Sequence, residues 1–394
     1  MAVVPVAVLL AAVPACRPGG GPTPTGPQSA AAGPVVPGVG GSIAGPGRLV
    51  IAWCDRWGVA SPTTAGGKAD LVTVHAYGMD EHRPLEGRSA VLPDGATAPG
   101  LCGPPRSTSA AADRQMFNAD LTLLAGTVPA PGGGRAAAAF ALSDGRATAP
   151  EPGTVADGRG PLFRTGSSAL WYARADGRVA AHDLAVPGAA PAPQGQVPGP
   201  DFALDGDRVW SRRPLETKAD GVVVVPGGEV AAGEAGGGAV LWHRTDPASS
   251  YGQQYVEPVR LGRGDSGSGL PGADQLPRCW PRLWLGPRTL LCISADNLYR
   301  VTLADDFGAV RQAEPLLPAG GPRTTDAVAS PDGRSLAYLT AQDGETSLYR
   351  LDLAAGARPV RVSRIPSAGP IPSDSARTVL PGTDRGAPRL IAWL

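Results

Sequence analysis

Residues 330–353 most constrain how this chain of 394 residues can fold, because they read as two short strands framed by tight turns. A Pro-Asp-Gly turn at residues 331–333 leads into an apolar strand at residues 336–339. A second turn at Asp343-Gly344 follows, after which residues 348–353 (LYRLDL) largely alternate apolar with polar. A hairpin of this size cannot bury its apolar face alone. The pattern therefore predicts a repeated antiparallel architecture in which neighbouring units cover one another.

The unit resembles the repeat of TolB-like, WD40-like β-propellers, which carry a W-S-P-D-G turn, an I-A-F strand and a closing I-Y-V-x-D strand. Here the turn reads Ser330-Pro331-Asp332-Gly333, and Ala329 stands where the family has tryptophan. The resemblance implies an all-β β-propeller. It also implies protein partners in the bacterial cell envelope, contacted at the rim of the propeller or at its central channel.

Look-alikes of the strand that ends at Ala337-Tyr338 recur along the chain at steps of 32 to 55 residues. Four-stranded propeller blades repeat every 40 to 50 residues or so. The two ends also match, since residues 48–53 (RLVIAW) resemble residues 389–393 (RLIAW), which predicts neighbouring first and last strands in one blade. We expect a β-propeller domain over residues 47–394 with seven blades. Six or eight blades, a β-sandwich and two small β domains are the alternatives.

The N-terminus predicts export and lipid anchoring. Residues 1–15 are apolar and uncharged, as in the h-region of a secretory signal peptide. They end in Val13-Pro14-Ala15 before Cys16, which resembles the lipobox of bacterial lipoproteins with Cys16 as the lipidated residue; a plain secretory signal is the alternative. The basic n-region is missing, which we interpret as a start codon assigned too far downstream. Residues 16–46 are rich in Gly and Pro with one charge and no aromatic residue, so we expect a disordered tether.

Four cysteines remain beyond Cys16, an even number that suits two disulfides in an exported protein. Cys279 and Cys292 flank a short apolar stretch with a Gly-Pro turn signal, so a hairpin would bring them together. Of the three possible connectivities we expect this local pair, with Cys54–Cys102 as the remainder. A zinc site is the alternative, but the sequence has no C-x-x-C spacing and its four histidines are scattered.

Composition and motifs exclude several functions. Lys plus Arg equals Asp plus Glu at 35 each, so the chain offers no net field for nucleic acid. Residues 264–267 copy the G-D-S-G sequence of serine proteases, yet no histidine lies in a recognisable catalytic motif. Acidic pairs at residues 205 and 207 and at residues 305 and 306 read as turn carboxylates, too few for a calcium loop. We therefore expect no catalytic residue, cofactor or metal.

Tryptophans recur at one strand position and predict core between blades, at residues Trp171, Trp210 and Trp242. Trp57 and Trp284 lie outside this register and are candidates for surface contacts, although Trp284 has the alternative of covering the Cys279–Cys292 hairpin.

The leading hypothesis is a monomeric, lipid-anchored propeller on the extracytoplasmic face of the cell membrane, which binds or scaffolds an envelope protein. The alternative is a secreted or anchored enzyme acting on carbohydrate, with Asp205, Asp207 or Asp326 near the channel. Two carboxylates converging about 5 to 9 Å apart in a deep pocket would favour that enzyme. A degenerate family member retained for the stability of an envelope complex is a third possibility.

Overall fold

The computed structural model describes residues 43–60, 68–102, 110–151, 161–196, 279–286, 288–304, 310–365 and 386–394, with residue 155, the strands between residues 202 and 269, and the strands at residues 35–36 and 378–380. Strands predominate, and the helices in this part of the chain are α1 (Pro99–Cys102) and α2 (Ala110–Arg114). No helix among the described residues has the length and hydropathy needed to cross a bilayer. The predicted signal peptide and Cys16 lie outside the described residues.

The unit read from residues 330–353 forms the centre of a four-stranded antiparallel sheet. In its first turn Gly333 has a φ of 68°, and the Ser330 Oγ accepts a hydrogen bond of 2.9 Å from the amide of Ser335. In the second, Asp343 and Gly344 both have positive φ, as a two-residue hairpin of this hand requires. The strands, in spatial order, are β23 (Arg323–Ala329), β24 (Ser335–Gln342), β25 (Glu345–Asp352) and β26 (Val360–Ile365).

Similar sheets of three or four strands precede this one along the chain. All of their strand pairs are antiparallel except β13 and β14, which run parallel. The first sheet contains β5 (Leu123–Pro129), β6 (Arg135–Ala141) and β7 (Ala147–Thr148). The second contains β8 (Leu162–Phe163), β9 (Ala169–Ala173), β10 (Arg178–Asp183) and β11 (Ala192–Gln196). The third contains β12 (Phe202–Asp205), β13 (Arg208–Ser211) and β14 (Val222–Val224). The fourth contains β15 (Glu229–Ala235), β16 (Ala239–Thr245), β17 (Val256–Leu261) and β18 (Ser268–Gly269). The fifth is β19 (Cys279–Gly286), β20 (Thr289–Ser294), β21 (Leu298–Leu303), β22 (Val310–Pro315).

The two ends of the chain share the remaining sheet, as their matching sequences predict. In this six-stranded sheet β28 pairs with β2 in the register Leu49 with Trp393 and Val50 with Ala392. This pairing holds the last strand of the chain against one of the first. The strands are β1 (Val35–Val36), β2 (Arg48–Ala60), β3 (Lys68–Gly78), β4 (Arg83–Val91), β27 (Thr378–Leu380) and β28 (Arg389–Trp393).

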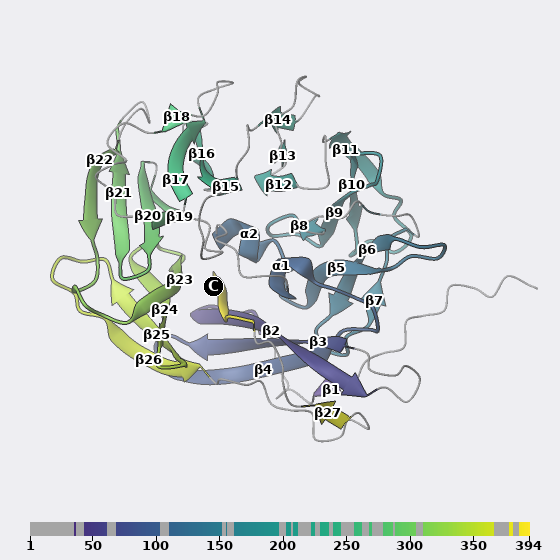
Figure 1. Ribbon diagram of the computed structural model, residues 1–394, viewed down its shortest axis with the longest axis horizontal. Helices are drawn as coiled ribbons and strands as arrows, with labels where there is room; N and C mark the ends of the chain where they lie inside the picture. The colour runs from purple at the N-terminus through teal and green to yellow at the C-terminus, as the bar shows by residue number, and fades with distance from the viewer. Residues whose placement is uncertain are drawn as a thin grey trace, which may run out of the picture.

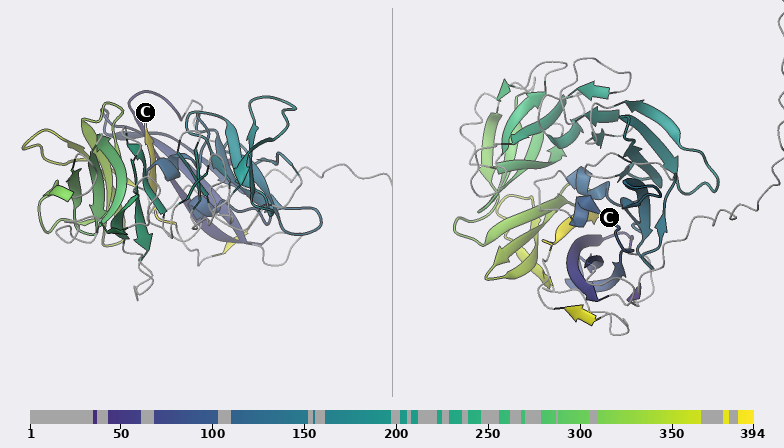
Figure 2. Two further views of the ribbon diagram at one scale, coloured as in Figure 1. Left: turned by 90° about the horizontal axis from the view of Figure 1, so that it is seen from above. Right: turned by 45° about the vertical axis from the view of Figure 1, so that its right-hand side comes forward.

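The described residues thus form seven sheets, which lie around a common centre like the blades of a propeller (Figure 1). The right-hand view of Figure 2 shows the same ring of sheets, with the C-terminus near its middle. The helices α1 and α2 also lie in the middle of the ring (Figure 1). The chain is therefore all-β with propeller-like sheets.

The core lies between neighbouring sheets. Leu49, Ile51 and Leu390 of the shared sheet pack with Ala337 and Leu348 of the β23–β26 sheet. A second cluster joins the β19–β22 sheet to the opposite face of β24 and β25, and others lie between further neighbours. Strands that are buried on both faces carry apolar side chains at nearly every position, which explains runs such as Leu336–Leu339.

The packed part of the chain includes residues before the expected start at Gly47. Ile43, inside the segment predicted as a tether, is 1% exposed and belongs to the cluster beneath α1 and β2. The strand at Val35–Val36 pairs with β4. The remainder of residues 16–46 stays a prediction, apart from Ala44, Gly45 and Pro46, which the structure also describes.

Candidate functional site

The centre of the ring is occupied by the chain itself. Residues 110–118, which we call the central segment, comprise α2 and the turn that follows it and belong to the connection from β4 to β5 (Figure 1). The Gln115 Nε2 donates a hydrogen bond of 2.8 Å to the carbonyl of Leu204 on β12. The amide of Phe163 on β8 donates to the carbonyl of Gln115 over 2.6 Å. The central segment therefore joins two sheets that do not follow it directly in sequence.

Four charged residues bind the central segment to three strands of the ring; we call them the central charge network. Arg282 on β19 is 2% exposed and places its Nη1 at 2.7 Å from the Asp113 carboxylate of α2. Its Nη2 lies 2.8 Å from the carboxylate of Asp326 on β23. Arg389 on β28 donates to Asp113 over 3.1 Å. Two arginines and two carboxylates thus meet in a buried cluster.

Backbone groups complete this network. The Asp326 carboxylate accepts the amides of Leu390 and Ala327, each over 2.7 Å, and so also holds β28 against β23. Arg282 donates to the carbonyls of Ala327 and Leu390 over 3.2 and 3.4 Å. Buried charges are retained when they are paired and hydrogen-bonded in this way.

The electrostatics of the network follow from its burial. Burial and the nearby charge of Asp113 raise the pKa of Asp326 to about 6, although Arg282 opposes this shift. Burial lowers the pKa of Arg282, but the attraction of Asp326 and Asp113 outweighs it and leaves that pKa raised. The arginine is therefore charged at every physiological pH. The network acts as a clamp that fixes the central segment.

This geometry differs from the carboxylate pair of a glycoside hydrolase. Such a pair flanks the substrate, with one acid poised to donate its proton and the other facing the sugar or a water. Here Asp113 and Asp326 share one guanidinium, and their side chains are 3% and 8% exposed. The alternative hypothesis placed Asp326 near the channel. In the structure it lies on β23 and is an ion-pair partner of Arg282, which also contacts Asp113 of the central segment.

A second polar cluster lies on the β8–β11 sheet. Glu151 accepts hydrogen bonds of 2.9 and 3.0 Å from the Nε and Nη2 of Arg174 and one of 2.7 Å from the Tyr172 hydroxyl. Burial would raise the pKa of Glu151, but these donors, the charge of Arg174 and that of His182 prevail and lower it. The result is a carboxylate held ionised beside the strand, a bidentate arrangement that fixes the chain after β7.

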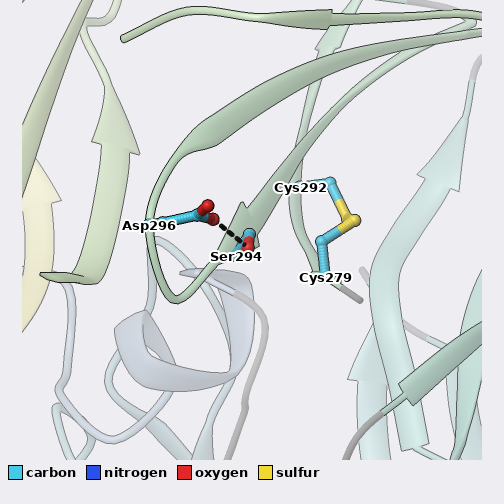
Figure 3. The surroundings of a disulfide bond; sticks show 4 residues. All are labelled: Cys279, Cys292, Ser294 and Asp296. Atoms are coloured by element: carbon cyan, nitrogen blue, oxygen red, sulfur yellow. Dashed lines mark hydrogen bonds between the residues drawn. A yellow bond between two sulfur atoms is a disulfide. The ribbon is translucent and has the colours of Figure 1, made fainter. Parts of the chain in front are cut away.

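Both predicted disulfides are present. Cys279 and Cys292 join β19 to β20 with a Cα separation of 5.6 Å, and Ser294 bonds to Asp296 nearby (Figure 3). Cys54 on β2 joins Cys102 on α1 with a Cα separation of 5.0 Å. Trp284 packs on the cluster that contains Cys279 and Cys292, in agreement with the alternative that it covers this hairpin.

The remaining sequence candidates divide into two groups. Trp171 is 4% exposed and packs against β12 between two sheets, as predicted. The other group lies outside the residues or side chains that the structure describes: Cys16, Trp57, Asp205, Asp207, Trp210, Trp242, residues 264–267, Asp305 and Asp306.

Sequence reasoning missed most of the central charge network. The sequence contains one signal for Arg282, because it is the single charged residue in the otherwise apolar strand CWPRLWLG and a buried charge needs a partner. Asp113, Arg389 and Glu151 stand among other polar or small residues and give no comparable signal.

Comparison with known proteins gives structural matches only. No protein-family model matches the sequence, and neither does any curated protein. Solved structures similar to this chain include TolB from Acinetobacter baumannii, at 13% identity over 90% of this chain and 68% of the other, with a TM-score of 0.36. An oligogalacturonate lyase from Vibrio parahaemolyticus matches at 10% identity over 82% and 75%, with a TM-score of 0.36. A dihydro-heme d1 dehydrogenase matches at 10% identity over 81% and 65%, with a TM-score of 0.41. Matches at this level assign neither substrate nor partner.

Proposed function

We propose that this chain is a lipid-anchored, seven-bladed β-propeller on the extracytoplasmic face of the cell membrane, which binds or scaffolds a protein of the envelope. The observation that carries the proposal is the presence of the chain's own residues in the centre of the ring. The central segment occupies it, and the central charge network holds that segment in place. The protein partner would then bind the outer surface or the rim of the ring.

The polar chemistry of the centre supports binding over catalysis. An enzyme needs an acid, base or nucleophile that reaches its substrate. Asp113, Arg282, Asp326 and Arg389 instead bind one another and the backbone, with side chains at most 11% exposed. The two carboxylates of this network, Asp113 and Asp326, therefore already serve the clamp.

The anchor rests on the sequence. The apolar residues 1–15 and Cys16 provide the signal and the lipidation site, and the Gly/Pro-rich stretch that follows provides a spacer. A propeller held close to the membrane in this way meets membrane and envelope proteins at high effective concentration.

The test of the anchor is the mass and location of the mature chain, expressed at full length in a bacterial host. We expect the wild type in the membrane fraction with a diacylated N-terminal Cys16, and the Cys16→Ala variant without that lipid. Wild-type protein in the medium with an unmodified Cys16 would overturn the anchor.

The test of binding uses a photo-crosslinking amino acid at Val186 or Val360, the large apolar side chains that are 52% and 47% exposed. We expect a defined adduct with an envelope protein from intact cells expressing the anchored form. The same position in the Cys16→Ala form is the matched control and should give less adduct. Release of sugars from envelope polysaccharide by the purified chain, beyond that of heat-denatured protein, would replace the binding proposal with the enzyme.

A further inference from the structure

The Cys54–Cys102 disulfide lies beside a buried carboxylate. The two sulfurs and a carboxylate oxygen of Asp70 all lie within 4.8 Å of one another. Cys54 is 4% exposed and Asp70 is 6% exposed, so both face the protein interior. Three potential metal ligands therefore converge at one end of the core beneath α1.

The fold explains why these residues meet. Cys54 on β2 pairs with Val72 on β3, and Asp70 stands two residues before Val72. Residues two apart on a strand point to the same face, so Asp70 and Cys54 share a face of the sheet. The helix α1 brings Cys102 over that face, since Leu101 packs into the same core and the Cys102 amide bonds to the carbonyl of Ala98.

Two thiolates and a carboxylate are a ligand set for a thiophilic divalent cation. Zinc binds thiolate sulfur at about 2.3 Å and carboxylate oxygen at about 2.0 to 2.2 Å in a tetrahedron. Ligand atoms of such a tetrahedron lie roughly 3.3 to 3.8 Å apart by those bond lengths. The two sulfurs are bonded at 2.00 Å in the disulfide, so reduction has to let them separate by somewhat less than 2 Å before they bind a metal. Three protein ligands leave a fourth position for water.

We propose that Cys54, Asp70 and Cys102 form a redox-controlled zinc-type site, which is a disulfide when oxidised and binds the metal when reduced. A dithiol reductant supplies two electrons and two protons and becomes a disulfide, while the protein disulfide opens to two thiols. Binding of the cation then releases two protons, because the ligands are thiolates. The buried Asp70 oxygen is the third ligand, and it is in place before the metal arrives. This inference does not depend on the proposed partner binding.

The other disulfide provides the internal comparison. Among the described residues, the Cys54, Asp70 and Cys102 cluster is the one group of three or more His, Cys, Asp or Glu side chains with this convergence. A reduced Cys279–Cys292 pair would offer two thiolates without a comparable third ligand among the described residues. The two pairs should therefore differ in metal affinity, although each joins two elements that pack against each other.

The experiment uses Co²⁺ as the probe, because its thiolate charge-transfer and ligand-field bands report both sulfur ligation and tetrahedral geometry. The full chain is reduced with a phosphine, which does not itself supply a thiol, and titrated anaerobically. In the Cys279→Ser/Cys292→Ser background we expect one equivalent of tetrahedral Co²⁺, displaced by Zn²⁺. In the Cys54→Ser/Cys102→Ser background we expect weaker binding without that spectrum.

Asp70→Asn isolates the carboxylate. Loss of even an outer partner of a metal ligand lowers affinity by about 10- to 100-fold, so loss of this ligand should weaken Co²⁺ binding at least about tenfold. Circular dichroism of the oxidised variant establishes that it folds, and the oxidised wild type should bind no Co²⁺ at this position. Equal affinity in Asp70→Asn, equal spectra from the two cysteine backgrounds, or no Co²⁺ binding by the reduced folded chain would overturn the proposal.

Discussion

Replacing Arg282 with methionine should destabilise the protein more than any exposed charge substitution. The arginine is 2% exposed and forms ion pairs of 2.7 and 2.8 Å with Asp113 and Asp326. Without it, Asp113 keeps its ion pair with Arg389, whereas Asp326 loses the arginine it contacts and is left with the two backbone amides that it accepts. Removing one partner of a buried ion pair costs about 3 to 5 kcal/mol. Methionine fills part of the volume, so most of this loss is electrostatic.

The loss should depend on pH with a definite sign. At pH 8 the variant must bury an unpaired carboxylate, whereas at pH 5 a carboxylate whose pKa already lies near 6 is neutralised by protonation. We expect a loss of about 3 to 5 kcal/mol in the free energy of unfolding at pH 8 and clearly less at pH 5. Denaturant unfolding followed by tryptophan fluorescence at both pH values measures it.

Two control variants make this prediction refutable. Arg178→Met removes an ion pair of 3.5 Å whose side chains are 68% and 54% exposed, and it should unfold close to wild type. The double variant Arg282→Met/Asp326→Asn restores the balance of charge and should recover part of the stability. The reasoning is refuted by a loss at pH 8 below about 1 kcal/mol, a value expected of surface pairs, or by a loss that is the same at pH 5.

Three further predictions follow from the structure. Because burial and Asp113 raise the folded-state pKa of Asp326 to about 6, from about 3.9 in the unfolded chain, the folded protein takes up this proton first. Its contribution to stability therefore rises as pH falls from about 6 to about 4, and Asp326→Asn should remove that rise from the unfolding profile. Replacing both cysteines of the Cys54–Cys102 disulfide, which are 48 residues apart, should lower the free energy of unfolding by about 4 kcal/mol. The same change at Cys279–Cys292, which are 13 residues apart, should lower it by about 3 kcal/mol, because the shorter loop restricts the unfolded chain less. The reverse order in denaturant unfolding would contradict this loop-entropy argument. Gly126→Ala should cost about 1 to 3 kcal/mol because its Cβ would overlap the buried Phe140 ring and the backbone just before α1. The control Gly286→Ala meets no atom within 4 Å, and equal melting temperatures of the two variants would refute this prediction.

The local features of the fold were predictable because each depends on neighbouring residues. The Pro-Asp-Gly and Asp-Gly turns need positive φ or short polar side chains at fixed positions, and the structure places those turns between β23 and β25. The matched ends predicted the pairing of β2 with β28, because the first and last strands of a propeller commonly share one blade. The local pairing of Cys279 with Cys292 likewise needed only a hairpin.

By itself, then, the sequence predicted the strand periodicity, the turns, the meeting of the two chain ends and the hairpin disulfide Cys279–Cys292, with Cys54–Cys102 expected only as the remaining pair. Tertiary structure alone decided what fills the centre. Asp113 and Arg389 are 276 positions apart, and Arg282 and Asp326 come from two other elements, so no local pattern connects them. Local propensity acts over a few residues, whereas a buried charge finds its partner only after the sheets have closed around it.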